Sequence, residues 1–195
     1  MLQTILLIVA VVVVLFVVIV ALRPAEFRVE RSALISAPPA AAFAQVNDFH
    51  QWEAWSPWAK LDPAAKNSFE GPSAGTGAIF RWAGNKQVGE GSMTIVESRP
   101  DEFIRIKLEF LKPFANTCAA EFTFKPEGNQ TAISWSMTGK NNFMSKAVGL
   151  FMNCEKMVGG QFEKGLAAMK SVVEAAPRES TVTFAPRDPV ATAKP

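Results

Sequence analysis

The sequence predicts an α+β fold in which a curved antiparallel sheet wraps around a long C-terminal helix, preceded by one transmembrane helix. Residues 145–175 carry apolar side chains at three- and four-residue steps, the period of an amphipathic helix. Segments with the two-residue alternation of strands come before it, and residues 2–22 are almost entirely apolar. A helix and a meander of strands each have one apolar face, so we expect the two to close on each other.

The apolar N-terminal segment is long enough to cross a membrane. Residues 2–22 carry no charge and only two polar side chains, Gln3 and Thr4, and about 20 such residues span the hydrocarbon core as a helix. A cleaved signal peptide is the alternative. The segment is too long for one, has no basic residues at its start and lacks a small-residue cleavage site before Arg23. We therefore predict an uncleaved transmembrane anchor over residues 1–23.

The charges that flank this segment predict its orientation. Arg23, Arg28 and Arg31 follow it, and only the α-amino group precedes it. Because cytoplasmic flanks are enriched in Lys and Arg, we expect a single-pass membrane protein with its soluble domain on the cytoplasmic side.

Seven segments between the anchor and the C-terminal helix are predicted to be strands. The clearest alternation sets Ile104, Ile106, Leu108 and Phe110 against charged residues. Turns containing Gly, Pro, Asn or Asp separate several of the segments, which predicts an antiparallel meander. The expected strands are 26–35, 68–71, 78–82, 88–98, 104–110, 117–124 and 133–138.

Two short helices are expected between the first and second strands. The first covers residues 40–46, and the second covers 47–58 and ends at a Ser-Pro pair. Three tryptophans fall within seven residues of this second helix. Trp52 and Trp55 share a helical face, and Trp58 lies just past the Ser-Pro pair.

The C-terminal helix has one continuous apolar face. Glycines at positions 159, 160 and 165 weaken a helix, so they indicate a neighbour or a ligand that approaches its backbone closely. Residues 176–195 are rich in Pro, Ala, Thr and charge without periodicity and are predicted to be a disordered tail. One folded domain therefore remains, over residues 26–175. The apolar face consists of Val148, Phe151, Val158, Phe162, Leu166, Met169 and Val173.

Composition argues against several classes of function. The net charge of +2, without a stripe of Lys and Arg, argues against nucleic-acid binding. One histidine, His50, and two distant cysteines, Cys118 and Cys154, argue against a zinc site or a His-based catalytic triad. The glycine-rich segments match no phosphate-binding motif. We expect no metal and no cofactor.

Glu155 has two interpretations. On a continuous helix over 145–175 it lies within the apolar face, where burial would raise the pKa of its carboxyl group toward the range of a general acid. Alternatively, Asn153 caps a new helix, which leaves Glu155 exposed in the first turn near the positive end of the helix dipole. The second interpretation is preferred.

Several short segments carry a family resemblance: FRVERS at 27–32, ISAP at 35–38, VNDF at 46–49, WEAWSPW at 52–58, GEGSMTI at 89–95, and residues 159–166. They resemble the SRPBCC (START/Bet v 1-like) superfamily, in particular its bacterial polyketide cyclase/dehydrase-type members, over about residues 26–175. The resemblance implies the helix-grip fold, a deep hydrophobic pocket between sheet and C-terminal helix, and a bacterial inner membrane as the location. Members of the superfamily bind lipids, sterols, polyketides or plant hormones, and a minority catalyse. No shared catalytic motif comes with the resemblance, so no catalytic residue is assigned.

The preferred hypothesis is a membrane-anchored, non-enzymatic domain that binds a hydrophobic small molecule or lipid. A cyclase or hydratase-like enzyme, with Glu155 and a second polar group in the pocket, is one alternative. A protein-interaction module like the chaperone-activating branch is another. The aromatic residues either fill the core or line a cavity, and we divide them evenly between the two. The candidate ligand-binding residues are Trp52, Trp55, Trp58, Trp82, Phe110, Trp135, Met137, Met152, Glu155 and Phe162.

Overall fold

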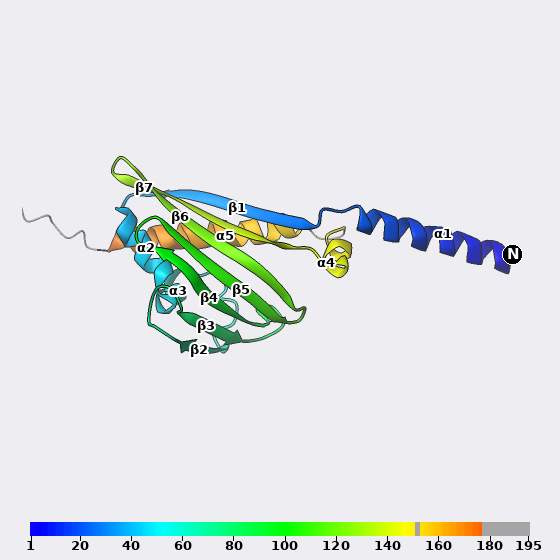
Figure 1. The fold of residues 1–195 in the computed structure, drawn as a ribbon, viewed down its shortest axis with the longest axis horizontal. Helices are drawn as coiled ribbons and strands as arrows, with labels where there is room; N and C mark the ends of the chain where they lie inside the picture. Colours follow the sequence, from blue (N-terminus) through cyan, green and yellow to red (C-terminus); the bar gives the residue numbers. More distant parts are fainter. Residues whose placement is uncertain (151–152, 177–195) are drawn as a thin grey trace, which may run out of the picture.

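The computed structural model describes residues 1–150 and 153–176, and it confirms the α+β prediction (Figure 1). Seven strands form one antiparallel sheet in the order β1-β7-β6-β5-β4-β3-β2. Each strand overlaps a segment that the sequence predicts to be a strand, with ends that differ by a few residues. The strands are β1 (Glu26–Ile35), β2 (Lys66–Glu70), β3 (Ile79–Ala83), β4 (Glu90–Arg99), β5 (Phe103–Lys112), β6 (Asn116–Glu127) and β7 (Gln130–Lys140).

The first strand, β1, lies at one edge of the sheet, next to the last strand, β7. Strands β2 to β7 follow one another as neighbours, whereas β1 pairs with β7 over its whole length, from Glu26 opposite Lys140 to Ile35 opposite Thr131. This pairing places the start of the domain and the end of the meander at one edge of the sheet. The C-terminal helix packs against β1 at this edge (Figure 1).

The helices are α1 (Leu2–Ala21), α2 (Pro39–Asn47), a 3-10 turn η1 (Phe49–Gln51), α3 (Trp52–Trp55), α4 (Phe143–Val148) and α5 (Cys154–Ala175). Helix α5 packs against β1, α2 and α3. The face of the sheet that it covers is called the inner face below.

The prediction of one continuous helix over residues 145–175 was wrong. Helix α4 ends at Val148 with Gly149 as its C-cap, and α5 begins at Cys154. The Asn153 side chain accepts a hydrogen bond of 2.9 Å from the backbone N–H of Lys156. This N-cap satisfies one of the free donors at a helix start, so a fresh helix begins there although the apolar spacing continues through the gap.

Protein neighbours, rather than a ligand, explain two of the three glycines of α5. A Cβ atom at Gly159 would overlap the guanidinium group of Arg31. A Cβ at Gly165 would lie 2.9 Å from the Trp135 ring and 3.1 Å from Pro57. No atom lies within 4 Å of the Cβ position at Gly160. The helix therefore approaches β1 and β7 closely because it has no side chains at these two positions.

The two faces of the sheet differ as the alternation predicts. On β5, Ile104 and Ile106 are fully buried on the inner face, opposite Phe122 and Ala120 of β6. On the outer face, Arg105 pairs with Glu121 at 2.9 Å.

The N-terminal helix is attached to the domain at its C-terminal end. The Arg23 guanidinium donates a hydrogen bond of 3.0 Å to the carbonyl of Gly149, and the Lys146 ammonium lies 3.4 Å from the carbonyl of Ala21. Helix α4 contacts α1, and Val20 is the one buried residue of α1. The rest of α1 projects from the domain (Figure 1).

Candidate functional site

Four of the ten candidate residues form a closed aromatic core beneath α5. The Trp135 and Phe162 rings stack with centroids 4.0 Å apart and planes 11° apart, and Trp135 also stacks on Phe122 at 4.9 Å. Trp52 and Trp55 meet Trp135 edge-on. Trp55, Phe162 and Trp135 are at most 2 % exposed. Rings in mutual contact leave no room between them, so this part of the helix-sheet interface is packed core.

The polar atoms of these tryptophans are used mostly within the core. Trp52 Nε1 donates to the carbonyl of Val46 and Trp55 Nε1 to the carbonyl of Gln45, each at 3.1 Å. These bonds attach α3 to α2. In the described part of the chain, Trp135 Nε1 is buried without an acceptor.

A second group of aromatic residues lies elsewhere, at the end of the inner face nearest α1. Trp82 of β3 and Phe110 of β5 meet edge-on at 6.0 Å, and Trp82 stacks against Phe80. Trp82 Nε1 donates to the carbonyl of Val88 at 3.0 Å, which orients its ring. Both candidate residues are only partly buried.

Sequence reasoning missed three residues that complete this second group. Phe80 and Met93 are opposite each other in register on β3 and β4, and Met93 is opposite Leu108 of β5. All three are partly buried and pack against the core. The parity that aligns Leu108 with Phe110 was visible in the sequence, but the pairing with Met93 and Phe80 needs the register. The group Phe80, Trp82, Met93, Leu108 and Phe110 is called the inner-face patch below.

A glycine gives the patch its shape. Gly91 of β4 is opposite Phe110 on one side and Trp82 on the other. A Cβ at this position would lie 2.5 Å from the Trp82 ring. The absence of a side chain at Gly91 therefore lets the two aromatic rings come together over the strand.

The remaining candidate residues have different surroundings. Trp58 is partly buried and meets Trp135 and Phe162 edge-on, so it lies at the border of the closed core. Met137 is buried, opposite Ala120 and Val29. Met152 lies outside the described residues.

Glu155 lies on the surface, as the interpretation with a new helix predicts. Its side chain is 56 % exposed, and its carboxylate is 2.8 Å from Arg31 Nη2. Arg31 also pairs with Glu163 at 2.7 Å. The hydrogen bonds that Arg31 donates to Glu163 and then to Glu155 raise the pKa of its guanidinium group. Glu155 therefore fixes α5 on β1, and the structure does not bring it into the inner-face patch.

The other titratable candidates do not converge on a site. His50 is about half exposed, and its Nδ1 lies 2.7 Å from an oxygen of Asp48. Its ring stacks on Phe69 at 3.9 Å. Burial raises the pKa of the Cys118 thiol, which disfavours the reactive thiolate. In residues 1–150 and 153–176 no group of three His, Cys, Asp or Glu side chains is arranged to hold a metal ion.

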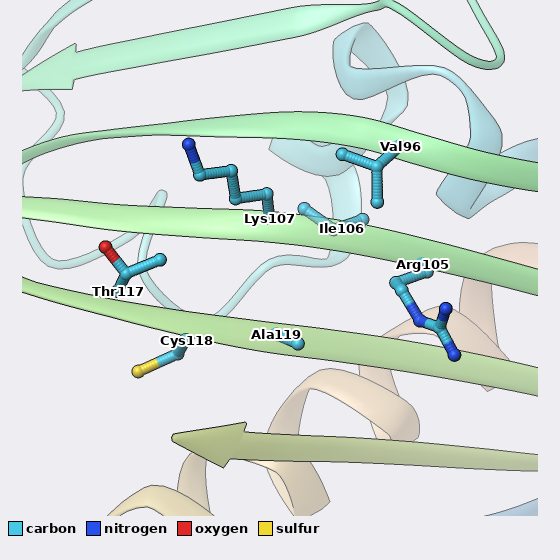
Figure 2. Close-up of a pocket in the computed structure, with 7 residues that line it drawn as sticks. All are labelled: Val96, Arg105, Ile106, Lys107, Thr117, Cys118 and Ala119. Atoms are coloured by element: carbon cyan, nitrogen blue, oxygen red, sulfur yellow. The ribbon is translucent and has the colours of Figure 1, made fainter. Parts of the chain in front are cut away.

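Two hollows on the surface are lined by none of the nine candidate residues that the structure describes. One, of about 390 Å³, runs over β4, β5 and β6 (Figure 2). It includes the exposed side chains of Val96, Arg105 and Lys107, so it opens on the outer face. The other, of about 480 Å³, lies where β1 begins and β7 ends, beside Phe27 and Gly139. Neither hollow lies between the inner face and α5.

Comparison with known proteins supports the fold and a family. The model of the family described as "Polyketide cyclase / dehydrase and lipid transport" matches residues 26–174. No curated protein matches the chain in sequence. The chain is also similar to solved structures, and the three described next are each below 20 % identical to it.

Three of these structures match this chain over most of its length. Protein CV1439 from Chromobacterium violaceum is 16 % identical with a TM-score of 0.55, and the match covers 79 % of this chain and 100 % of that one. The Aha1 dimer from Colwellia psychrerythraea is 12 % identical with a TM-score of 0.55, covering 76 % and 97 %. The di-domain ARO/CYC protein BexL, from the BE-7585A biosynthetic pathway, is 17 % identical with a TM-score of 0.57, covering 83 % and 54 %. At these identities the likeness shows the fold alone.

Proposed function

Since the chain belongs to the polyketide cyclase/dehydrase and lipid transport family, we propose that it is a membrane-anchored domain that binds a hydrophobic small molecule or lipid. The binding surface is the inner-face patch, and α1 keeps this surface close to the bilayer that supplies the ligand. The closed core beneath the middle of α5 serves as the rigid wall of the site.

One observation carries this proposal. The aromatic and aliphatic side chains of the inner-face patch stay partly exposed although they continue directly from a fully buried core. Covering apolar surface stabilises a complex by roughly 25 cal/mol for each Å² removed from water. An apolar ligand on this patch therefore gains affinity mainly from desolvation, and the rings of Trp82 and Phe110 offer it flat contact surfaces.

The anchor rests on the length and composition of α1. Its 20 residues form one apolar helix that is almost entirely exposed, and at 1.5 Å per residue they span about 30 Å, the thickness of the hydrocarbon core. A signal sequence can have the same composition. The contacts of Arg23 with Gly149 and of Lys146 with Ala21 favour a retained helix, because they join its end to the folded domain.

Native mass spectrometry of the full chain, extracted gently from membranes, tests the proposal. We expect a bound lipid or apolar molecule that M93K removes, because a lysine on the inner face puts a charge on the patch. The matched control is V96K, since Val96 is on the same strand but 44 % exposed on the outer face. The variant F110K repeats the test at the edge of the patch if M93K folds poorly. Equal ligand retention by the inner-face variants and V96K would contradict the proposal, and so would an empty wild-type protein.

An enzyme of the cyclase or hydratase kind has less support. It requires two polar groups that converge on a ligand, and the acid considered for this role, Glu155, faces solvent beside Arg31. The inner-face patch itself consists of apolar side chains, apart from the Trp82 N–H, which is already bonded to Val88. Binding without chemistry is therefore the better account of this surface.

A further inference from the structure

Exposed apolar side chains gather at the end of the domain nearest α1. Leu111 at the end of β5 is 59 % exposed, and Phe114 in the turn between β5 and β6 is 66 % exposed. In α4, Phe143 is 51 % exposed and Met144 is 56 % exposed. Large apolar side chains that extend into solvent together are a common mark of a contact surface.

The topology brings these two segments to the same end of the sheet. Strand β1 begins right after α1, with Phe27 opposite Gly139 of β7. Gly139 is in turn opposite Cys118, near the start of β6. The β5–β6 turn and α4 therefore both lie at the end where the chain leaves α1 (Figure 1).

Charge differs between the two ends of the domain. Turns and strand ends near α1 carry Lys86, Lys112 and Lys140, of which Lys112 pairs with Glu90 at 2.7 Å and Lys140 is opposite Glu26 in register. The far end carries Asp101, Glu102 and Glu127 together with Arg99 and Lys125, so it has no excess of cations. A surface with lysines around exposed apolar residues is complementary to an anionic lipid surface.

We propose that this end of the domain is a second membrane-contact surface, in which Leu111, Phe114, Phe143 and Met144 insert into the interfacial region of the bilayer that α1 crosses. The inference rests on the proposed anchor role of α1. Lys112, Lys140 and Lys146 lie at the level of the lipid headgroups. The domain therefore contacts the membrane surface directly, in addition to being attached to it through α1.

Such contact has a consequence for the proposed site. Phe110 belongs to the inner-face patch, and the next residue, Leu111, belongs to the membrane-contact surface. The patch therefore ends one residue from the membrane-contact surface along β5, although successive side chains of a strand point to opposite faces. A lipid that leaves the bilayer beside this end of the sheet has only a short path to the patch, which limits how much of its acyl chain is exposed to water on the way.

Photo-crosslinking of the full chain in nanodiscs tests the inference. The photoreactive residue p-benzoylphenylalanine replaces Phe114 in one variant and Leu34 in another, the control. Leu34 is also exposed, at 43 %, but lies near the far end of β1. In nanodiscs of phosphatidylcholine and phosphatidylglycerol, we expect the variant at position 114 to gain the mass of a lipid and the variant at position 34 to stay unmodified. Capture at position 114 should fall roughly fivefold or more in the double variant K112Q/K140Q.

The outcomes separate this inference from the anchor proposal. If the protein enters nanodiscs but position 114 captures no more lipid than position 34, the membrane-contact surface is wrong and the anchor stands. If the protein does not enter nanodiscs at all, both fail. Capture of a protein at position 114 in native membranes, in place of lipid, would also overturn the inference and would favour a protein-interaction module.

Discussion

Arg31 is the residue that explains most about how α5 is held. It lies on the inner face of β1, opposite Trp135, and its guanidinium reaches two carboxylates of α5, Glu155 and Glu163, at 2.8 and 2.7 Å. Gly159 lies beneath this group. An arginine that pairs with two acids is a small network, which contributes more than an isolated surface pair.

The glycines of α5 give a prediction with an internal control. Gly160→Ala should stabilise the protein by up to about 1 kcal/mol, because alanine favours a helix and no atom lies near the new Cβ. Gly159→Ala should destabilise it, because the new Cβ displaces Arg31 from its two partners. In an Arg31→Ala background the sign at position 159 should reverse. Thermal unfolding of the full chain in detergent measures all three, and destabilisation by Gly159→Ala that persists without Arg31 would contradict the explanation.

Glu30 gives a prediction about pH. The hydrogen bond from Ser134, followed by that from Arg28, lowers the pKa of Glu30 below its ordinary value of 4.5. The unfolded chain therefore binds more protons near that pH, so this contribution is present above the unfolded pKa and is lost as pH falls through the folded pKa. Ser134→Ala should lower the free energy of unfolding at pH 7. This loss should become progressively smaller between about pH 5 and pH 3. Melting curves across this range test it, with Ser32→Ala as the control that keeps the Ser134–Glu30 bond; an unchanged pH profile in Ser134→Ala would count against this role.

At the scale of elements, the break between α4 and α5 shows where sequence reasoning fails. The apolar spacing predicted the helical residues correctly, but it carries no information about a cap, and Asn153 starts a second helix inside the expected one. The strands were easier to predict because two-residue alternation and turn residues agree along most of the meander. Local periodicity and capping are separate signals, and here the cap determines where α5 begins.

The cap itself can be tested. Asn153→Ala should destabilise the protein by about 1 kcal/mol, because the backbone N–H of Lys156 loses its acceptor. Asn153→Asp should keep most of the stability, since its carboxylate accepts the same bond near the positive end of the helix dipole. Chemical unfolding of the two variants compares them directly. Equal losses in both would mean that Asn153 stabilises α5 by some other contact.

Candidate site residues were harder to predict than the elements that carry them. Trp52, Trp55, Trp135 and Phe162 lie on inner faces, as their spacing indicates, but whether such rings line a cavity or fill it depends on how they pack against one another. The stacking of Trp135 on Phe162 joins β7 to α5, and no local pattern encodes it. Phe80, Met93 and Leu108 were missed for a related reason, because strand register alone brings them together.

At the scale of the whole molecule, orientation across the membrane is the last prediction. Three arginines follow α1 closely in the sequence, so the domain should lie on the cytoplasmic side. Arg23 bonds to Gly149 and Arg28 pairs with Glu30, but a charge retained on the flank of the helix still opposes transfer across the bilayer. A fluorescent protein fused to the C-terminus should therefore be bright, and an alkaline phosphatase fused there should be inactive. Active phosphatase outside the membrane would contradict this orientation and would place the inner-face patch beside the opposite leaflet.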